Sequence, residues 1–389
     1  MSEQQQLIAW RVLAVVTLVL ALATVYTFIR SKQPPFDEGS TYRIVYNRDL
    51  GGTYHIVHCG LDGLDCRHLV DSDSMDIMPS AAPPSAEAGD EPRIAFLRID
   101  PQSNEAQGRG PFVPGGVYVV GLRSGQLAKV SAELDRVVSV RPSWSPDGRQ
   151  IAFGGVEDLN ADGAYALDES AVYISDVDTG GLRRVVSGLL AGWALSWSPA
   201  GDLLLATAMT PGDSTPRAFA LEISTGITYT HPEIGQITTA CWSPEGDRIA
   251  AYSREDHQIH VLDTEGEEIL AFDAPYGDVL ELIWTPGAAS QDSDGQLFAI
   301  AGSGFELGAG PLYRRSPSAD AAERWTPVAG AQSFTALLSA SPDGQYVAFS
   351  RFSSEHEGNL FVLERGDLQP RQLTSDPGFE GAATWVLVP

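Results

Sequence analysis

One acidic segment has the residue types and the spacing of a calcium site. The twelve residues that begin at Asp158 match the pattern D-x-[DN]-x-[DN]-G-x5-E at every position. Calcium binds six to eight oxygen atoms, and alternate oxygen-bearing residues on a bent loop can direct several of them to one point. We therefore predict ligands from the side chains of Asp158, Asn160 and Asp162, from the carbonyl of Ala164 and from both carboxylate oxygens of Glu169.

The setting of this segment leaves a second interpretation open. Tyr165 stands where calcium loops usually carry an aliphatic residue, and the flanking segments are typical of strands and not of helices. The alternative is a solvated acidic loop, in which Asn and Asp simply favour turns. If calcium binds, we expect a structural ion that orders the loop.

Motifs for catalysis are weak in this chain. The sequence contains no G-x-S-x-G nucleophile motif. His55 and His58 are three residues apart on an expected strand, so they point to opposite faces and cannot bind one metal together, and His257 and His260 share this spacing. Paired carboxylates for hydrolysis are available in number, but the sequence does not bring any two of them together.

The cysteines favour an oxidising compartment. Cys59 and Cys66 bracket the turn GLDGLD between two apparent strands, and a hairpin would place them opposite each other. We predict a Cys59–Cys66 disulfide, which belongs in an extracytoplasmic space. Two reduced thiols are the alternative. Cys241 follows Ala240 in an apolar segment, which indicates a buried free thiol.

A repeated sequence motif is expected to position all these residues. Its clearest copies are PSWSPDGRQIAF, LSWSPAGDLLLA, ACWSPEGDRIAA and SASPDGQYVAF, which begin at Pro142, Leu195, Ala240 and Ser339. Each copy predicts a strand, a tight turn and a second strand, because Pro presets φ in the turn and Gly supplies its positive-φ position. Trp144, the last aromatic residue before the first of these turns, is expected in the core between sheets.

The number of repeats predicts the number of blades. Second-strand motifs are spaced 45 to 57 residues apart, and they begin at Arg43, Arg93, Gln150, Leu203, Arg248, Leu297 and Tyr346. Four short strands per repeat at this period are typical of a β-propeller. The first motif lacks a preceding strand, and an unpaired strand, Ala383–Val388, ends the chain. We therefore predict an all-β, seven-bladed β-propeller that is closed by the C-terminal strand.

These motifs resemble the TolB-like family of propellers, whose repeats centre on a WSPDGxxIAF-type sequence. The resemblance covers Tyr42 to Pro389, and two copies depart from it: the segment from Trp284 to Gly295 carries an insertion, and Met78–Pro92 replaces the turn with an Ala/Pro-rich stretch. The resemblance implies a periplasmic or membrane-tethered binding scaffold. The family's type protein has fewer blades than the seven counted here, so its particular partners are not implied.

Long connections single out one face of the ring. Connections from the second to the third strand share a face with those that lead to the next repeat, and four of the former are long: Pro101–Gly115, Val156–Ser170, Met209–Pro216 and Gly302–Gly310. Longer loops cost ordering entropy, so we interpret this face as a binding surface. Neutral variation in loop length is the alternative.

The N-terminal segment predicts a membrane anchor. Val12–Ile29 contains no charge, Gly or Pro, and a helix of this length is close to the hydrocarbon thickness of a bilayer. We assign residues 1–11 to a short tail, 12–29 to one transmembrane helix, 30–40 to a linker and 41–389 to the propeller. A cleaved signal peptide is the main alternative, with Ala21-Leu22-Ala23 as its cleavage site. The positive charges on the two flanks do not settle the orientation.

Net charge limits the partners. Lys and Arg number 25 against 51 Asp and Glu, which gives −26. Such a field repels phosphate backbones, so nucleic acid is excluded as an expected partner. We expect a single-pass membrane protein whose propeller lies outside the cytoplasm and acts as a non-catalytic binding or assembly scaffold for a protein or cell-envelope component. The alternative is a propeller hydrolase or lyase that acts on glycans or peptides.

Overall fold

The computed structural model describes most of the chain from Tyr42 onward. The described residues are 42–49, 51–70, 72–84, 91–101, 115–131, 134, 136–137, 141–157, 169–210, 212, 217–230, 234, 236–287, 294–302, 309–317, 323–330, 335–354, 357–367 and 369–388. The predicted membrane helix and the linker lie outside them. No helix among the residues described is both long enough and apolar enough to span a bilayer.

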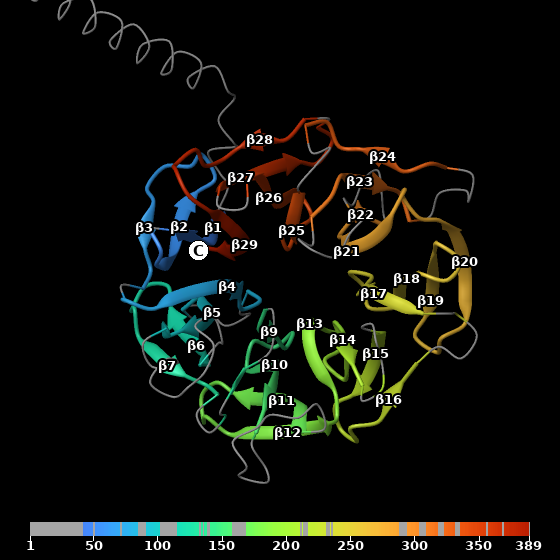
Figure 1. Cartoon of the computed structure of the whole chain (residues 1–389), viewed down its shortest axis with the longest axis horizontal. Helices are drawn as coiled ribbons and strands as arrows, with labels where there is room; N and C mark the ends of the chain where they lie inside the picture. The colour runs from blue at the N-terminus through green and yellow to red at the C-terminus, as the bar shows by residue number, and fades with distance from the viewer. Residues whose placement is uncertain are drawn as a thin grey trace, which may run out of the picture. The chain divides into compact units, whose positions relative to one another are not determined.

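Seven antiparallel sheets follow one another around a central axis, which confirms the predicted seven-bladed propeller (Figure 1). We number the blades 1 to 7 in chain order and their strands 1 to 4 from the axis outward. Blade 1 contains β29 (Glu380–Leu387), β1 (Tyr42–Asp49), β2 (Tyr54–Gly60) and β3 (Arg67–His68). Blade 2 contains β4 (Met75–Ala81), β5 (Arg93–Ile99), β6 (Gly116–Gly121) and β7 (Leu127–Lys129). Blade 3 contains β8 (Arg136–Val137) with β9 (Ser143–Trp144), β10 (Gln150–Val156), β11 (Ser170–Asp176) and β12 (Leu182–Ser187).

The remaining blades each have four strands in sequence order. Blade 4 contains β13 (Leu190–Trp197), β14 (Leu203–Met209), β15 (Arg217–Glu222) and β16 (Thr228–Tyr229), and blade 5 contains β17 (Ile237–Trp242), β18 (Arg248–Ser253), β19 (Gln258–Asp263) and β20 (Glu268–Asp273). Blade 6 contains β21 (Asp278–Thr285), β22 (Gln296–Gly302), β23 (Leu312–Arg315) and β24 (Thr326–Pro327). Blade 7 contains β25 (Thr335–Ala340), β26 (Tyr346–Ser354), β27 (Glu357–Glu364) and β28 (Arg371–Gln372). Blade 3 alone has an inner position divided between two short strands, β8 and β9, which both pair with β10.

The C-terminal strand closes the ring, as predicted. β29 pairs antiparallel with β1, from Tyr42 opposite Leu387 to Arg48 opposite Glu380. β29 begins at Glu380, three residues before the apolar segment predicted from the sequence. Its first backbone pair therefore includes a charged residue. Closure places the first and last described strands in one sheet and covers the inner edge of β1.

Tryptophans at the ends of inner strands connect neighbouring blades. Four of them donate an indole N–H to a carbonyl on the inner strand of the preceding blade, at 2.9 to 3.1 Å: Trp144 to Ser80, Trp197 to Ser143, Trp242 to Ser196 and Trp385 to Ser339. Trp284 is different, since its indole donates to the carbonyl of Asp294 in its own blade. That is the blade with the predicted insertion.

The Ser-Pro-Asp-Gly turn forms for a local reason. In blade 3 the Ser145 hydroxyl donates to the carboxylate of Asp147 at 2.6 Å and accepts from the backbone N–H of Gln150 at 2.9 Å. Gly148 closes the turn with a φ of 67°, which side chains disfavour. Apolar side chains fill the space between adjacent sheets, as Leu97 of blade 2 does against Ile151 of blade 3. The core is therefore a series of interfaces between blades.

Bulges recur on the inner strands. The pairing register shifts in the inner strand pair of blades 1, 2, 4, 5, 6 and 7. In three consecutive blades the bulge holds a residue other than glycine at positive φ: Leu337 at 63°, Ala382 at 52° and Met78 at 55°. Such conformations cost free energy and persist where surrounding contacts hold them.

Candidate functional site

Antiparallel order puts two kinds of connection on one face of the ring. The connections from strand 2 to strand 3 and from strand 4 to the next blade lie together on what we call the loop face, and the Ser-Pro-Asp-Gly turns lie on the opposite turn face. The four long connections that the sequence singles out fall largely outside the described residues. The described side chains beside these connections form the candidate site.

The predicted calcium loop is described only at its end. Asp158, Asn160, Asp162 and Ala164 lie outside the described residues, so the site stays a prediction. Glu169 directly precedes β11 and is only 6% exposed. Across the part of the chain that is described, no three His, Cys, Asp or Glu side chains are placed to hold a metal ion.

Three aromatic side chains gather on the loop face where blade 7 meets blade 1. The ring of Phe379 lies 5.4 Å from that of Phe352 and 6.2 Å from that of Tyr54, measured between centroids. All three are half-buried, and the backbone carbonyl of Phe379 accepts a 2.8 Å hydrogen bond from Asp49. We call Tyr54, Phe352 and Phe379 the aromatic group. Its rings offer a large and rigid contact surface at little cost in side-chain entropy.

A fourth aromatic residue on this face is almost free of protein contact. Tyr276 lies in the short connection from β20 to β21 and is 91% exposed. Gly277 follows with a φ of 97°, and a side chain there would meet the backbone of Gly302 at 2.9 Å. The connection is thus held tightly against blade 6, and it displays the tyrosine ring to solvent.

Charged side chains beside Tyr276 are paired. Asp278, the first residue of β21, accepts from Arg254 at 2.8 Å and from the Tyr252 hydroxyl at 3.2 Å. Burial, followed by the charge of Asp278, raises the pKa of Tyr252 to about 12. These contacts fix the base of the connection that carries Tyr276. They do not cover its ring, which stays exposed to solvent.

Blades 1 and 2 carry a carboxylate opposite an arginine at the same position of the sheet. In blade 2, Asp76 lies opposite Arg98 and accepts two hydrogen bonds, at 2.7 and 2.9 Å. In blade 1, Glu380 lies opposite Arg48, but the nearest approach of Arg48 Nε to Oε1 is 3.5 Å. Arg48 directs its Nη2 to Asp376 instead, at 2.9 Å. Glu380 therefore has a much weaker partner than Asp76.

The weak pairing of Glu380 has an electrostatic consequence. Its side chain is 0% exposed. Burial raises the pKa of the Glu380 carboxyl to about 7, against the opposing effects of the Thr374 hydroxyl and of Arg48. A buried carboxyl whose nearest cation makes no direct hydrogen bond to it is thus partly protonated near neutral pH.

A second carboxylate, half-buried near the axis, supports a bulge. Glu281 of blade 6 accepts hydrogen bonds from the backbone N–H groups of Leu337 and Leu338 in blade 7, each at 2.9 Å. Burial raises the pKa of Glu281 and lowers that of Arg141, which precedes β9 in blade 3, and each charge opposes the shift of the other. The carboxylate thus satisfies two donors that the bulge removes from the ladder.

The histidines occupy separate positions, in line with the expected geometry. His55 packs edge-on against His68, whereas His58 Nδ1 accepts from Arg43 at 2.8 Å. His257 lies 3.2 Å from the Tyr252 hydroxyl. His260 lies between two carboxylates, that of Glu268 at 2.6 Å and that of Asp256 at 3.0 Å. The spacing of these residues in the sequence does not predict this arrangement. At 5% exposure His260 is a structural residue and cannot reach a substrate.

The structure joins Cys59 and Cys66 in a disulfide, with a Cα–Cα distance of 4.1 Å. The register of β2 and β3 explains it, because Val57 pairs with His68 and His58 with Arg67, which leaves the cysteines next in line. Cys241 is buried, and burial raises the pKa of its thiol. It is therefore protonated and unreactive at neutral pH.

Comparison with known proteins gives the fold. No protein-family model matches the sequence, and no curated protein matches it. Among solved structures, an oligogalacturonate lyase in complex with manganese is 12% identical, with a TM-score of 0.58 over 83% of this chain and 85% of that one. The oligogalacturonate lyase of Vibrio parahaemolyticus is also 12% identical, with a TM-score of 0.55 over 82% and 85%. TolB from Acinetobacter baumannii is 16% identical, with a TM-score of 0.49, and this chain spans 66% of it. Similarity at these identities shows a common propeller fold.

Sequence reasoning missed Tyr276, Glu380 and the aromatic group. One signal was present: Tyr276 stands in the short turn Ala-Pro-Tyr-Gly, which has no room to bury a ring. Glu380 and Phe379 gave no such signal, since their surroundings come from the pairing of β29 with a strand more than three hundred residues away.

Proposed function

We propose that this chain is a non-catalytic binding or assembly scaffold that recognises a protein or cell-envelope component through its loop face. Val12–Ile29 would tether it to the membrane, with the propeller outside the cytoplasm. One observation carries the proposal: Tyr276, 91% exposed, lies on the same face as the half-buried aromatic group. Aromatic residues that are displayed on rigid connections are the usual anchors of protein interfaces.

The energetics fit an interface of moderate affinity. A tyrosine that becomes buried against a partner commonly contributes about 2 kcal/mol or more when it is a hot spot. The free-energy cost of burying the Tyr276 ring is small, because Gly277 already fixes the backbone beside it and the exposed ring has few contacts to break. The paired Arg254 and Asp278 beside it would form the polar rim of such an interface.

The disulfide supports the assignment to an oxidising compartment. A bridge between Cys59 and Cys66 persists outside the cytoplasm and is rare within it. The apolar segment Val12–Ile29 is long enough for an anchor, and together with the disulfide it supports a tethered propeller outside the cytoplasm.

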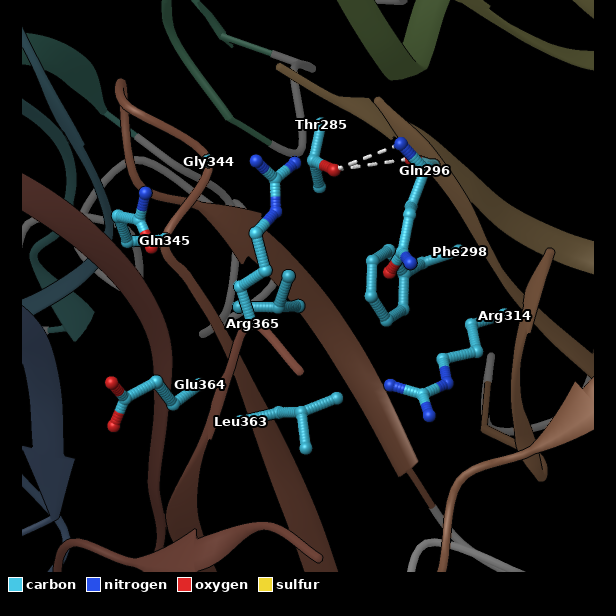
Figure 2. A pocket seen from close by; sticks show the side chains of 10 residues that line it. Thr285, Gln296, Phe298, Arg314, Gly344, Gln345, Leu363, Glu364 and Arg365 are labelled. Carbon is cyan, nitrogen blue, oxygen red and sulfur yellow. Dashed lines mark hydrogen bonds between the residues drawn. The ribbon is translucent and has the colours of Figure 1, made fainter. Parts of the chain in front are cut away.

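The alternative, a propeller lyase, is favoured by the structural similarity to two oligogalacturonate lyases. An enzyme site would bring groups with shifted pKa values into one pocket. In the described part of this chain, Glu380 and Glu281 lie in different blades, and the pocket between blades 6 and 7 is lined by neither (Figure 2). We therefore propose binding in preference to the lyase.

Co-purification tests the proposal against the alternative. The full chain would be purified from detergent-solubilised membranes as wild type, as Tyr276→Ala and as Tyr229→Ala, whose ring is 50% exposed on an outer strand. We expect a defined partner with the wild type and Tyr229→Ala, and its loss with Tyr276→Ala at unchanged thermal stability. Unsaturated product formed from oligogalacturonate by the purified wild type would establish the lyase instead.

A further inference from the structure

The connection that carries Tyr276 is bonded to a second exposed element of the loop face, the turn from β18 to β19. The backbone N–H of Ala274 donates to the carbonyl of His257 in that turn, at 2.9 Å. The Tyr252 hydroxyl lies 3.2 Å from His257 Nδ1 and 3.2 Å from the carboxylate of Asp278. His257 is therefore tied to both ends of the segment that displays the exposed tyrosine.

These contacts determine which nitrogen of His257 carries a proton. Asp278 forms an ion pair with Arg254 at 2.8 Å, and its carboxylate can only accept hydrogen bonds. The single hydroxyl proton of Tyr252 is therefore donated to Asp278, and the tyrosine oxygen accepts from Nδ1–H of His257. In the neutral imidazole this leaves Nε2 as an acceptor. His257 is exposed, and its Nε2 has no partner among the described residues.

The backbone of His257 adopts an unfavourable conformation. Its φ is 59°, a region that residues other than glycine rarely occupy. A glycine would adopt this conformation freely, so the turn itself does not need an imidazole. Strain of this kind is concentrated at binding and catalytic sites, where the side chain has a use.

The charges that surround this turn are acidic and lack basic partners. Glu255, at the tip of the turn, is exposed and forms no hydrogen bond or ion pair with any described residue. Asp273, at the start of the neighbouring connection, is also exposed, and its carboxylate accepts one long hydrogen bond, 3.4 Å, from Gln258. Arg254 is the basic residue of the turn, and its charge is compensated by Asp278. A cation that docks here therefore meets uncompensated negative charge.

From this geometry we infer that the surface formed by His257, Tyr276 and Glu255 binds a lysine or arginine side chain of a polypeptide partner. Ammonium and guanidinium groups have donors and no acceptor, which matches the free lone pair of Nε2. The face of an exposed tyrosine ring attracts a cation, and the nearby carboxylates supply the opposite charge. The inference rests on the function proposed above, because it gives the chemistry of the partner at the same face.

Fluorine NMR of the full chain labelled with 3-fluorotyrosine tests this surface, and Tyr276→Phe assigns the signal of Tyr276. The probe is a blocked peptide of alternating glycine and lysine at constant ionic strength. The same peptide with acetylated lysines is the control, because it keeps the apolar stems and loses the charge. Tyr229, which is 50% exposed beside Glu222, is an internal control for attraction by the net charge of the chain.

The matched variants are His257→Gly, which removes Nε2 and suits the positive φ, and His68→Gly, which removes an exposed histidine of blade 1. We expect a saturable shift of the Tyr276 signal with the lysine peptide, about tenfold weaker binding to His257→Gly, and unchanged binding to His68→Gly. His257→Asn decides the matter if the glycine variant does not fold. An equal shift of the Tyr229 signal, an equal response to the acetylated peptide, or equal affinity of His257→Gly and the wild type would each overturn the inference.

Competition separates this inference from the proposed function. The lysine peptide should displace the partner that co-purifies with the wild type, and the acetylated peptide should not. A partner that is lost with Tyr276→Ala, but is neither displaced by the lysine peptide nor weakened by His257→Gly, would overturn the inference and leave the scaffold function standing. A partner that Tyr276→Ala retains would overturn the proposed function, and the NMR titration would still decide whether this surface binds a cationic side chain.

Discussion

Replacement of Glu380 by glutamine should stabilise the propeller above neutral pH and not below pH 5. The pKa of this buried carboxyl is about 7 in the folded protein, above its ordinary value of 4.5. The folded state therefore binds the proton more tightly than the unfolded state does. The stabilisation from this group is complete below about pH 4.5, and it is lost as the pH rises to 7 and beyond.

The magnitude follows from the shift. About 2.5 pKa units correspond to about 3 kcal/mol, which is the free energy of unfolding that Glu380 removes once it is ionised. Glutamine keeps the shape of the protonated acid and cannot ionise. Arg48 retains its 2.9 Å ion pair with Asp376, so the substitution leaves no isolated cation. For a domain of this size, the gain amounts to a Tm higher by roughly 4 °C at pH 8.

Thermal unfolding from pH 4.5 to 8, monitored by circular dichroism, measures this difference. Asp76→Asn is the matched control, because Asp76 occupies the same sheet position but makes a bidentate pair with Arg98. Its loss should destabilise by roughly 3 kcal/mol, since a half-buried arginine is left without its ion-pair partner. Parallel pH profiles of the wild type and Glu380→Gln, or a lower Tm of Glu380→Gln at pH 8, would refute the reasoning.

Trp197→Phe should cost about 1 kcal/mol beyond the change in packing, because the indole bond to the preceding blade is lost, and urea unfolding measures it. Deletion from Gly381 onward should abolish cooperative unfolding, since it unpairs β1 and reopens the ring; a truncated protein that melts as sharply as the full chain would contradict closure by β29. Calcium at ~5 mM should protect the loop that begins at Asp158 from proteolysis, and an Asp158→Ala, Glu169→Ala double variant should lose that protection; equal cleavage of the wild type with and without calcium would exclude the site.

The fold could be predicted because its signals are local and repeated. Each Ser-Pro-Asp-Gly turn carries its own hydrogen bonds, as Ser145 and Asp147 show, so a short stretch of sequence specifies a hairpin. The candidate site could not be predicted to the same degree. Glu380 meets Arg48 only through ring closure, and Glu281 of blade 6 reaches the backbone N–H groups of Leu337 and Leu338 in blade 7. Contacts between distant segments leave no periodic trace in the sequence.

Photo-cross-linking at position 276 tests the binding function of the loop face most directly. A photoreactive phenylalanine analogue would replace Tyr276 in the full chain in its native membrane, and the same analogue would replace Tyr229 as the control. The proposed scaffold predicts one defined adduct from position 276 and none from position 229, because only Tyr276 is displayed at 91% exposure on the loop face. The absence of an adduct from position 276, or the same adduct from both positions, would contradict it.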